Sequence, residues 1–467
     1  MRLLLAVTPI YGHIVPLLGI GRGLVARGHH VSVMTGRKYA AAAAAGGMAF
    51  RPLPPAADFD DADLDGWLPG RQQRSRLAAG REDVVGFFVR PLPAQHAALC
   101  DELAVGNYDA VLGDVAFLGA LPLLLGTPPA GRVPILGVSA TPLSAVSVDC
   151  APFGSGMRPG HSMFSRSRNR QIDVLLRLGP WRPVQRALDA VLAPYGVPAG
   201  RLRYFDHALA FDTTFQLAPP DFEYPRRELP DRVRFVGPVR SGAGPDPDLP
   251  HWWADLDGSR PVVHVTQGTV ANANLGQLLV PALRALAGED VLVVAATGGR
   301  PLAALTAALG GALPANARVA EFLPYGDLLP RTAVMITNGG YGGVVQALRH
   351  GVPLVVAGRS EDKPEVAARV AWSGAGLNLR TDRPTQARLR RAVRTVLDRP
   401  SYRAGAVRLQ QQITALGDPV AAIAAELDAV IAGLAAAGAP STIKLSGSLT
   451  DLASRAERDP ARNVGGA

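Results

Sequence analysis

The sequence predicts an α/β protein with two doubly wound, Rossmann-like domains that face each other across a cleft. In each half of the chain, continuous apolar runs of strand length alternate with segments of helical spacing. This rhythm is typical of a parallel sheet covered on both faces. Ligands of such open sheets bind beyond the carboxyl ends of the strands, so we expect the functional site between the two domains.

The first domain is predicted over residues 1–220. It opens with an apolar strand at residues 2–8 and a turn, followed by helical spacing over residues 15–26. A second helical stretch is expected over residues 84–105. Further strands are expected at residues 30–35, 48–53, 110–115, 133–139 and 208–211.

The second domain is predicted over residues 261–436, after an interdomain linker at 221–260. The linker is inferred because residues 218–260 are rich in Pro, Asp and Gly. The last long helix is expected at residues 420–434, and residues 437–467 are predicted to be a mobile tail with one short helix near 450–458. Strands are expected at residues 261–266, 291–296, 317–322, 333–337 and 353–356.

Composition excludes several classes of protein. Of the 467 residues, 48% are hydrophobic and 19% are charged, which excludes general disorder. No apolar run has the length of a membrane span, and the N-terminus is typical of a core strand rather than a signal peptide. Cys100 and Cys150 are too few for a disulfide framework or a metal cluster. We therefore expect a cytoplasmic protein.

The positive net charge does not predict a nucleic-acid interface. Lys and Arg total 48 against 39 Asp and Glu, but only Lys38, Lys363 and Lys444 are lysines, and the arginines are scattered. The denser basic runs, at 71–76 and 166–170, lie in polar, loop-like stretches. We expect solvated loops there, with contact to an anionic ligand or surface as the alternative.

Two glycine-containing turns follow predicted strands of the second domain. One is Thr337-Asn338-Gly339-Gly340-Tyr341-Gly342-Gly343-Val344, and the other is Thr266-Gln267-Gly268-Thr269. Free N–H groups at a helix start form an anion site, and glycine lets the backbone approach the ligand closely. Two such turns suit a diphosphate. The alternative is that the glycines only make tight strand–helix turns.

Residues 322–376 resemble the nucleotide-sugar signature of the two-domain (GT-B) glycosyltransferases. The resemblance is to the family that includes plant UDP-sugar transferases and bacterial macrolide and polyketide glycosyltransferases. The motifs at 12–16 (GHIVP), 27–29 (RGH) and 233–238 (VRFVGP) also resemble this family, so that the likeness covers about residues 1–436. It implies a GT-B fold.

The resemblance implies roles for residues of the second domain. Phe322, followed by Leu323, stands where an aromatic residue stacks on the nucleobase, and Gln346 stands where a glutamate holds the ribose. Asp362 and Lys363 stand where Asp-Gln grips the sugar, and Asn338 stands where a histidine contacts the diphosphate. The other implied donor-binding residues are Gly268, Thr269, Gly339, Gly340, Tyr341, Gly342 and Gly343.

Four positions depart from the family pattern. Asn338 cannot carry a positive charge, and Gln346 is a weaker partner for a diol than a carboxylate. Lys363 would supply the missing cation or select an unusual sugar; the alternative is an exposed Asp-Lys pair of little consequence. Val366 replaces an asparagine. These changes leave the nucleotide (UDP or dTDP) and the sugar open.

His13, just after the first strand, is the candidate general base. A neutral imidazole there can take a proton from an acceptor hydroxyl, but it needs a partner that fixes its tautomer. The resemblance implies an aspartate after a later strand, and Asp114 is the matching position. Asp109 is the alternative, although it opens the strand and should face the opposite end of the sheet.

The acceptor is expected to contact two segments of the first domain, at residues 55–88 and 141–172. Aromatic and Met side chains there suit an apolar acceptor, although they could equally anchor loops. The candidates are Trp67, Phe87, Phe88, Phe153 and Met157, with Met163 and Phe164 nearby.

Together these observations predict an inverting glycosyltransferase that needs no metal and no bound cofactor. It would move a sugar from a nucleoside diphosphate to a hydroxyl of a small, lipophilic acceptor, with His13 as base and Asp114 orienting it. The alternative is a catalytically silent binding or helper protein of the same fold, which Asn338 and Gln346 favour. A nicotinamide oxidoreductase is disfavoured because no dinucleotide fingerprint follows a first strand. A homodimer stays open.

Overall fold

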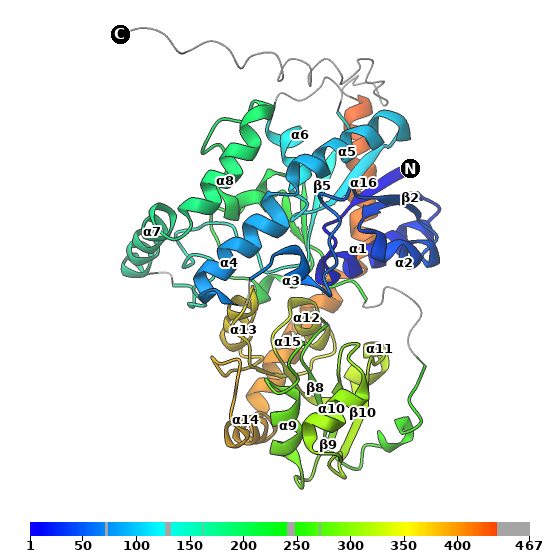
Figure 1. The fold of residues 1–467 in the computed structure, drawn as a ribbon, viewed down its shortest axis with the longest axis vertical. Helices are drawn as coiled ribbons and strands as arrows, with labels where there is room; N and C mark the ends of the chain where they lie inside the picture. The colour runs from blue at the N-terminus through cyan, green and yellow to red at the C-terminus, as the bar shows by residue number, and fades with distance from the viewer. Residues whose placement is uncertain (71–72, 127–131, 161, 241–247, 270–271, 437–467) are drawn as a thin grey trace.

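The structure, a computed structural model, describes residues 1–70, 73–126, 132–160, 162–240, 248–269 and 272–436. It contains two parallel sheets, one in each half of the chain, with helices packed around them (Figure 1). The first sheet has the strand order β3-β2-β1-β4-β5-β6-β7 and the second the order β10-β9-β8-β11-β12-β13. In both sheets the order reverses beside the first strand, which leaves a crevice at the carboxyl ends of β1 and β4 and of β8 and β11. The predicted fold class is confirmed.

The strands are short and mostly buried on both faces. Those of the first sheet are β1 (Arg2–Ala6), β2 (His30–Thr35), β3 (Ala49–Pro52), β4 (Ala110–Asp114), β5 (Ile135–Ser139), β6 (Thr214–Gln216) and β7 (Val233–Phe235). Those of the second sheet are β8 (Val262–Thr266), β9 (Leu292–Ala296), β10 (Ala317–Ala320), β11 (Thr332–Thr337), β12 (Leu354–Val356) and β13 (Gly376–Asn378).

Helices cover the sheets and extend the first half sideways. In the first half they are α1 (Tyr11–Val25), α2 (Ala40–Ala45), α3 (Leu64–Trp67), α4 (Arg76–Val84), α5 (Leu92–Gly106), α6 (Leu121–Leu125), α7 (Met163–Leu178) and α8 (Arg182–Leu192). In the second half they are α9 (Leu279–Leu286), α10 (Leu302–Leu309), α11 (Tyr325–Leu328), α12 (Tyr341–Arg349), α13 (Lys363–Trp372), α14 (Gln386–Asp398), α15 (Pro400–Leu416) and α16 (Pro419–Ala436). No helix of the described residues is long and apolar enough to cross a membrane.

The strand predicted at 208–211 is wrong. Tyr204–Ala210 forms a 3₁₀ helix, and the chain enters the sheet only at β6. The apolar residues of this run pack beneath the sheet instead of within it: Phe211 is buried in the core and lies against the bare backbone of Gly113 and Gly137. The predicted helix at 84–105 is likewise divided, because a π-helical turn, Val85–Val89, separates α4 from α5.

Two segments pack on the first half although the predicted domain boundaries place them outside the first domain. β7 lies within the predicted linker but pairs with β6 and completes the first sheet. α16 lies within the predicted second domain but packs on the first, where Val420, Ile423 and Leu427 join the core around α1. The apolar pattern of α16 predicts that one face is buried, but it does not indicate which of the two sheets the helix packs against. The predicted tail at 437–467, with Lys444, lies outside the described residues.

Candidate active site

His13 and Asp114 meet at the carboxyl end of the first sheet. His13 is in the first turn of α1, directly after β1, and Asp114 is the last residue of the neighbouring strand β4. The His13 Nδ1 lies 3.0 Å from the Asp114 Oδ1. Asp109 directly precedes β4 and accepts a hydrogen bond from the main chain of Arg2 at 2.7 Å, at the opposite end of the sheet. The structure therefore pairs His13 with the predicted aspartate and not with the alternative.

The carboxylate fixes the imidazole tautomer. A carboxylate can only accept, so the neutral His13 ring carries its proton on Nδ1 and leaves Nε2 as a proton acceptor. Burial lowers the pKa of His13, but the charge and hydrogen bond of Asp114 and the charge of Asp362 raise it, and the net shift is above the usual value of 6.5. Asp362 belongs to the second half of the chain, so a carboxylate of that half also acts on the charge of His13.

The two glycine turns lie side by side because β8 and β11 are adjacent strands. Gly268 and Gly339 both have positive φ, at 74° and 93°, which favours glycine at each turn. The Asn338 side chain donates its amide to the main-chain carbonyl of Gln267, and its Oδ1 accepts the Gly340 N–H at 3.3 Å. Asn338 thus ties the two turns together, a role that the sequence did not indicate.

The remaining residues of these turns differ in their exposure to solvent. Gly342 is exposed, while Gly343 and Thr269 are half-buried. Tyr341 points away from the turn: its hydroxyl accepts from Gln216 at 2.8 Å and donates to Glu223 at 3.2 Å. The Tyr341 hydroxyl therefore connects the start of α12 to β6 of the first sheet and to the segment that follows β6.

Phe322 offers an exposed aromatic ring, with 48% of its surface accessible. The ring lies over Gly299, where an added Cβ would come within 2.9 Å of it. Leu323 is buried in a cluster with Trp252 and Leu328, so the structure gives it a packing role. An exposed ring over bare backbone suits stacking against a planar base.

Gln346 and Val366 have contacts that explain their departure from the family pattern. The Gln346 side chain is buried and donates its amide to the main-chain carbonyl of Val239 at 2.6 Å, in the segment that connects the two halves. A glutamate could not make this bond, because a carboxylate does not donate. Val366 is fully buried in the core of the second half.

Lys363 is buried beside the glycine turn rather than exposed. Its side chain is 6% accessible and its ammonium pairs with Glu361, which has a positive φ of 55°. The Lys363 stem passes Gly339, where an added Cβ would lie 3.7 Å from the Lys363 Cβ. Burial raises the pKa of Asp362, although the charge of Lys363 acts in the opposite direction. The alternative of an exposed Asp-Lys pair does not apply, because Lys363 is buried and its ammonium pairs with the more exposed carboxylate of Glu361.

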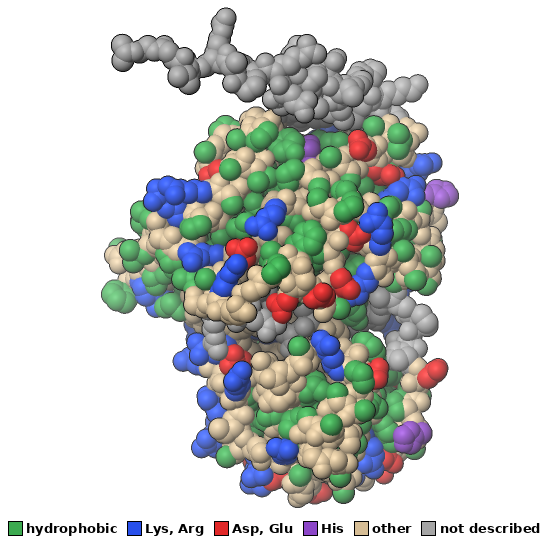
Figure 2. All heavy atoms as spheres, in the orientation of Figure 1, with side chains coloured by type: hydrophobic (Ala, Val, Ile, Leu, Met, Phe, Trp, Pro, Cys, Tyr) green, Lys and Arg blue, Asp and Glu red, His purple; other side chains and the backbone are tan. Residues whose placement is uncertain are grey.

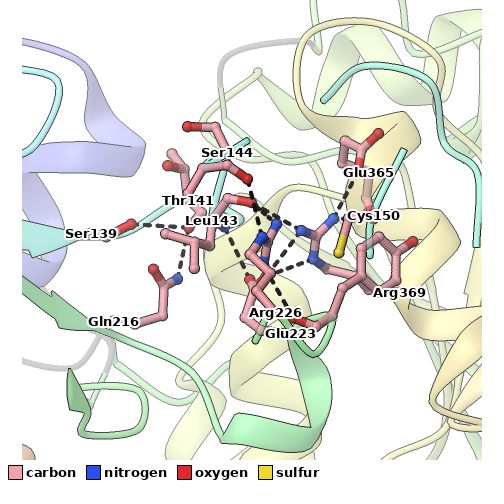
Figure 3. A network of polar contacts seen from close by, with 12 residues as sticks. Ser139, Thr141, Leu143, Ser144, Cys150, Gln216, Glu223, Arg226, Glu365 and Arg369 are labelled. Atoms are coloured by element: carbon pink, nitrogen blue, oxygen red, sulfur yellow. Dashed lines mark hydrogen bonds and ion pairs between the residues drawn. The ribbon is translucent and has the colours of Figure 1, made fainter. Parts of the chain in front are cut away.

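A buried polar network joins the halves beneath this site (Figure 3). Arg369 of α13 is fully buried, and its guanidinium donates to Glu223 at 2.9 Å and to Glu365 at 2.8 Å. It also donates to the carbonyl of Leu143 at 3.2 Å. Glu365 in turn accepts the main-chain N–H groups of Gly154 and Gly156, at 3.0 and 2.8 Å.

The acceptor candidates separate into two groups. Phe87 and Trp67 pack against Phe59 in a small hydrophobic cluster, which makes them loop anchors in this structure. Phe88 lies beside the catalytic candidate, with its ring centre 6.1 Å from that of His13. Phe153 packs on Phe205 at 5.7 Å, and Met157 is half-buried on the same loop. Met163 and Phe164 are exposed on α7.

Sequence reasoning missed an aromatic pocket between α7, α8 and the 146–153 segment. Its lining includes Phe153, Trp181, Tyr204 and Phe205. The ring of His207 lies 5.4 Å from Tyr204, and the charges of Asp114 and His13 both act on the pKa of His207, which burial lowers. Trp181 and Tyr204 stand in segments without a recognisable motif, so no local signal marked them.

Among the described residues, no group of three or more His, Cys, Asp or Glu side chains is placed to hold a metal ion. An anionic ligand here would meet the main-chain N–H groups at the start of α12 and the Lys363 region.

Comparison with known proteins gives consistent results across sequence and structure. Residues 288–430 match the family described as erythromycin biosynthesis protein CIII-like, C-terminal domain. The chain is 41% identical over 418 residues to 4'-demethylrebeccamycin synthase of Lentzea aerocolonigenes, covering 89% of this chain and 96% of that protein. It is 34% identical over 458 residues to UDP-glycosyltransferase 2 of Phaeomoniella chlamydospora, covering 92% and 96%.

Solved structures show the same fold. The glycosyltransferase of kitacinnamycin superposes with a TM-score of 0.66 at 23% identity, covering 92% of this chain and 97% of that one. The calicheamicin glycosyltransferase CalG4 gives 0.64 at 24% identity, covering 94% and 99%. A structure of the glycosyltransferase VinC in complex with dTDP gives 0.63 at 22% identity, covering 92% and 99%. The two-domain architecture is therefore the GT-B fold.

Proposed function

Because this chain belongs to the family of nucleotide-sugar-dependent glycosyltransferases, we propose that it transfers a sugar, with inversion at the anomeric carbon, to a small natural-product acceptor. The natural-product class is supported by the names of relatives and structural neighbours, which include rebeccamycin, calicheamicin and spinosyn enzymes. The donor is a UDP- or dTDP-linked sugar.

The observation that carries the proposal is the 3.0 Å contact between His13 and Asp114 at the edge of the cleft. His13 Nε2 takes the proton from the acceptor hydroxyl while its oxygen attacks the anomeric carbon. Asp114 keeps Nε2 free and stabilises the imidazolium that forms. Because attack and departure occur on opposite faces of the sugar, a single displacement inverts the configuration.

The second half holds the leaving group. Main-chain N–H groups in the first turn of α12, beyond Gly340, donate to the diphosphate, and the positive end of α12 stabilises the charge that grows as the bond breaks. Phe322 stacks on the base. Asp362 and Lys363 approach the sugar from the start of α13. We propose that this arrangement works without a metal ion, so that turnover persists in excess EDTA.

A second candidate is a catalytically silent helper of the same fold. Asn338 and Gln346 favoured it, but each has a structural partner, in Gln267 and Val239. Their departure from the family pattern therefore does not require the loss of catalysis. A helper would have no need of a buried imidazole held in one tautomer.

The test combines an acceptor panel with two readouts. The full chain is incubated with UDP- and dTDP-sugars and polycyclic or macrolide aglycones, and nucleoside diphosphate release and product mass are followed. The anomeric configuration of the product is then determined by NMR. Transfer with inversion supports the proposal; retention overturns the single-displacement mechanism. Nucleotide binding without transfer, across a broad panel, supports the helper.

A further inference from the structure

Large hydrophobic side chains are unusually exposed on one helix. Nine such side chains are exposed among the described residues, and five of them belong to α7. Met163 is 86% accessible and Phe164 81%, and the set is completed by Val174, Leu175 and Leu178. At 3.6 residues per turn these five fall within about a third of the helix circumference. They lie on one face in two groups, Met163 and Phe164 near the start of α7 and Val174, Leu175 and Leu178 near its end, with the polar Ser167 and Gln171 between the groups. We call these five side chains the α7 row.

Arginines border the α7 row on both sides. Helical spacing places Arg168 along one side, and Arg170 and Arg177 along the other. None of the three has an ion-pair partner among the described residues, whereas Arg166, further round the helix, pairs with Asp149. Residues 163–192, which span α7 and α8, contain six arginines and two aspartates. The row therefore lies within a strongly cationic surface.

The opposite face of α7 is the one that packs on the protein. Ser165 and Asn169 are buried there, and Asp173 and Leu176 line the aromatic pocket, which Arg177 also borders. Figure 1 shows α7 projecting at the side of the first half, and Figure 2 shows hydrophobic and basic side chains at that edge. The apolar row is thus presented on a convex edge and not within a groove.

We propose that α7 is an interfacial helix that docks the enzyme on an anionic lipid surface. The α7 row would enter the region between headgroups and acyl chains, and Arg168, Arg170 and Arg177 would remain at the headgroup phosphates. Basic residues beside an exposed Phe and Leu face are the chemistry that such surfaces select.

Charge distinguishes this occupant from a second copy of the chain. If two α7 rows packed against each other, the bordering arginines of both copies would be brought together without acidic partners, and like charges would oppose the contact. On an anionic lipid surface, by contrast, the arginines would meet headgroup phosphates, which carry the opposite charge. The docking does not depend on glycosyl transfer, so it can be measured without substrates.

The experiment is vesicle sedimentation of the full chain. Vesicles of phosphatidylcholine mixed with phosphatidylglycerol are compared with vesicles of phosphatidylcholine alone, at low and high salt. Binding is expected to anionic vesicles and to weaken with salt. Leu175→Gln/Leu178→Gln should reduce the partition coefficient about tenfold or more. Arg168→Gln/Arg170→Gln should reduce it about fivefold per arginine.

The control is Val105→Gln on α5, because Val105 is 74% accessible and lies outside α7. It should bind vesicles as the unchanged chain does, and all variants should keep the same melting temperature. Absence of binding to anionic vesicles overturns the proposal, as does binding that the α7 variants leave unchanged. A dimer that light scattering detects and that the Leu175→Gln/Leu178→Gln variant dissociates would instead assign the row to a second copy.

Discussion

Glu365 and Gly156 are joined by a 2.8 Å hydrogen bond that connects α13 of the second half directly to a loop of the first half. The same carboxylate accepts from Gly154, and both glycines have positive φ, so that the loop turns its N–H groups toward one point. Phe153 and Met157, two acceptor candidates, lie on this loop. Glu365, close to the proposed sugar-binding pair, thereby holds the loop that carries these candidates.

Glu365→Gln should destabilise the protein and raise KM for the acceptor more than KM for the donor. The amide would turn an N–H group toward the buried Arg369 guanidinium or toward the loop, and breaking a buried pair costs about 3–5 kcal/mol. Denaturant unfolding and steady-state kinetics measure the two effects.

Glu289→Gln is the matched control for Glu365→Gln. Glu289 likewise forms ion pairs, with Arg390 and Arg394, but these lie at the surface. Its loss should cost no more than about 1 kcal/mol and leave both KM values unchanged. Equal effects of the two substitutions would contradict a special role for Glu365.

His13→Ala should lower kcat by about 10²–10⁴-fold while leaving nucleoside diphosphate affinity unchanged, because the base acts on the acceptor and the donor binds in the other half. Calorimetry with dTDP and UDP checks the affinity. A parallel loss of nucleotide affinity would show that His13 supports the donor site and is not the base.

Asp114→Asn should shift the pH profile as well as lower the rate. The carboxylate raises the pKa of His13 against the effect of burial, so its removal lowers that pKa. The base is active when neutral, and the acid limb of kcat/KM for the acceptor should therefore move to lower pH while the plateau falls. Asp109→Asn, at the other end of β4, should leave the limb in place. A limb that does not move with Asp114→Asn would mean that another group titrates.

The site residues were predictable where they stand close to the carboxyl end of an apolar strand in the sequence. His13 follows the apolar strand β1 after a short turn, Asp114 ends the apolar strand β4, and the glycine turns follow β8 and β11. The partners of Asn338 and Gln346 are main-chain carbonyls 71 and 107 residues away, and a main-chain acceptor leaves no mark in a sequence. The three-residue strands β7 and β13 are too short for a periodic signal.

Gln346→Glu should harm the protein although it restores the residue common in the family. The carboxylate would face the carbonyl of Val239, two acceptors with no proton between them, where the amide now donates at 2.6 Å. We expect a loss of about 1–3 kcal/mol in the free energy of unfolding. Thermal unfolding with and without dTDP measures it. Unchanged stability together with tighter nucleotide binding would show that the side chain reorients to the ribose.

Lys363→Gln should alter the choice of sugar. The Lys363 ammonium is buried beside the Gly339 turn and paired with Glu361, on the loop that follows β12 and precedes α13. Its charge therefore lies where the sugar of the donor is expected, while the N–H groups at the start of α12 serve the diphosphate. One charged hydrogen bond contributes about 1.5–3 kcal/mol, which corresponds to a change of about tenfold or more. Ratios of kcat/KM among nucleotide sugars should shift by this factor, while the Kd of the bare nucleoside diphosphate changes less.

Lys38→Gln is the control, because Lys38 also pairs with carboxylates, Asp60 and Asp61, but at the surface of the other half. A donor profile that Lys363→Gln leaves unchanged, at unchanged melting temperature, would mean that the ammonium only neutralises Glu361.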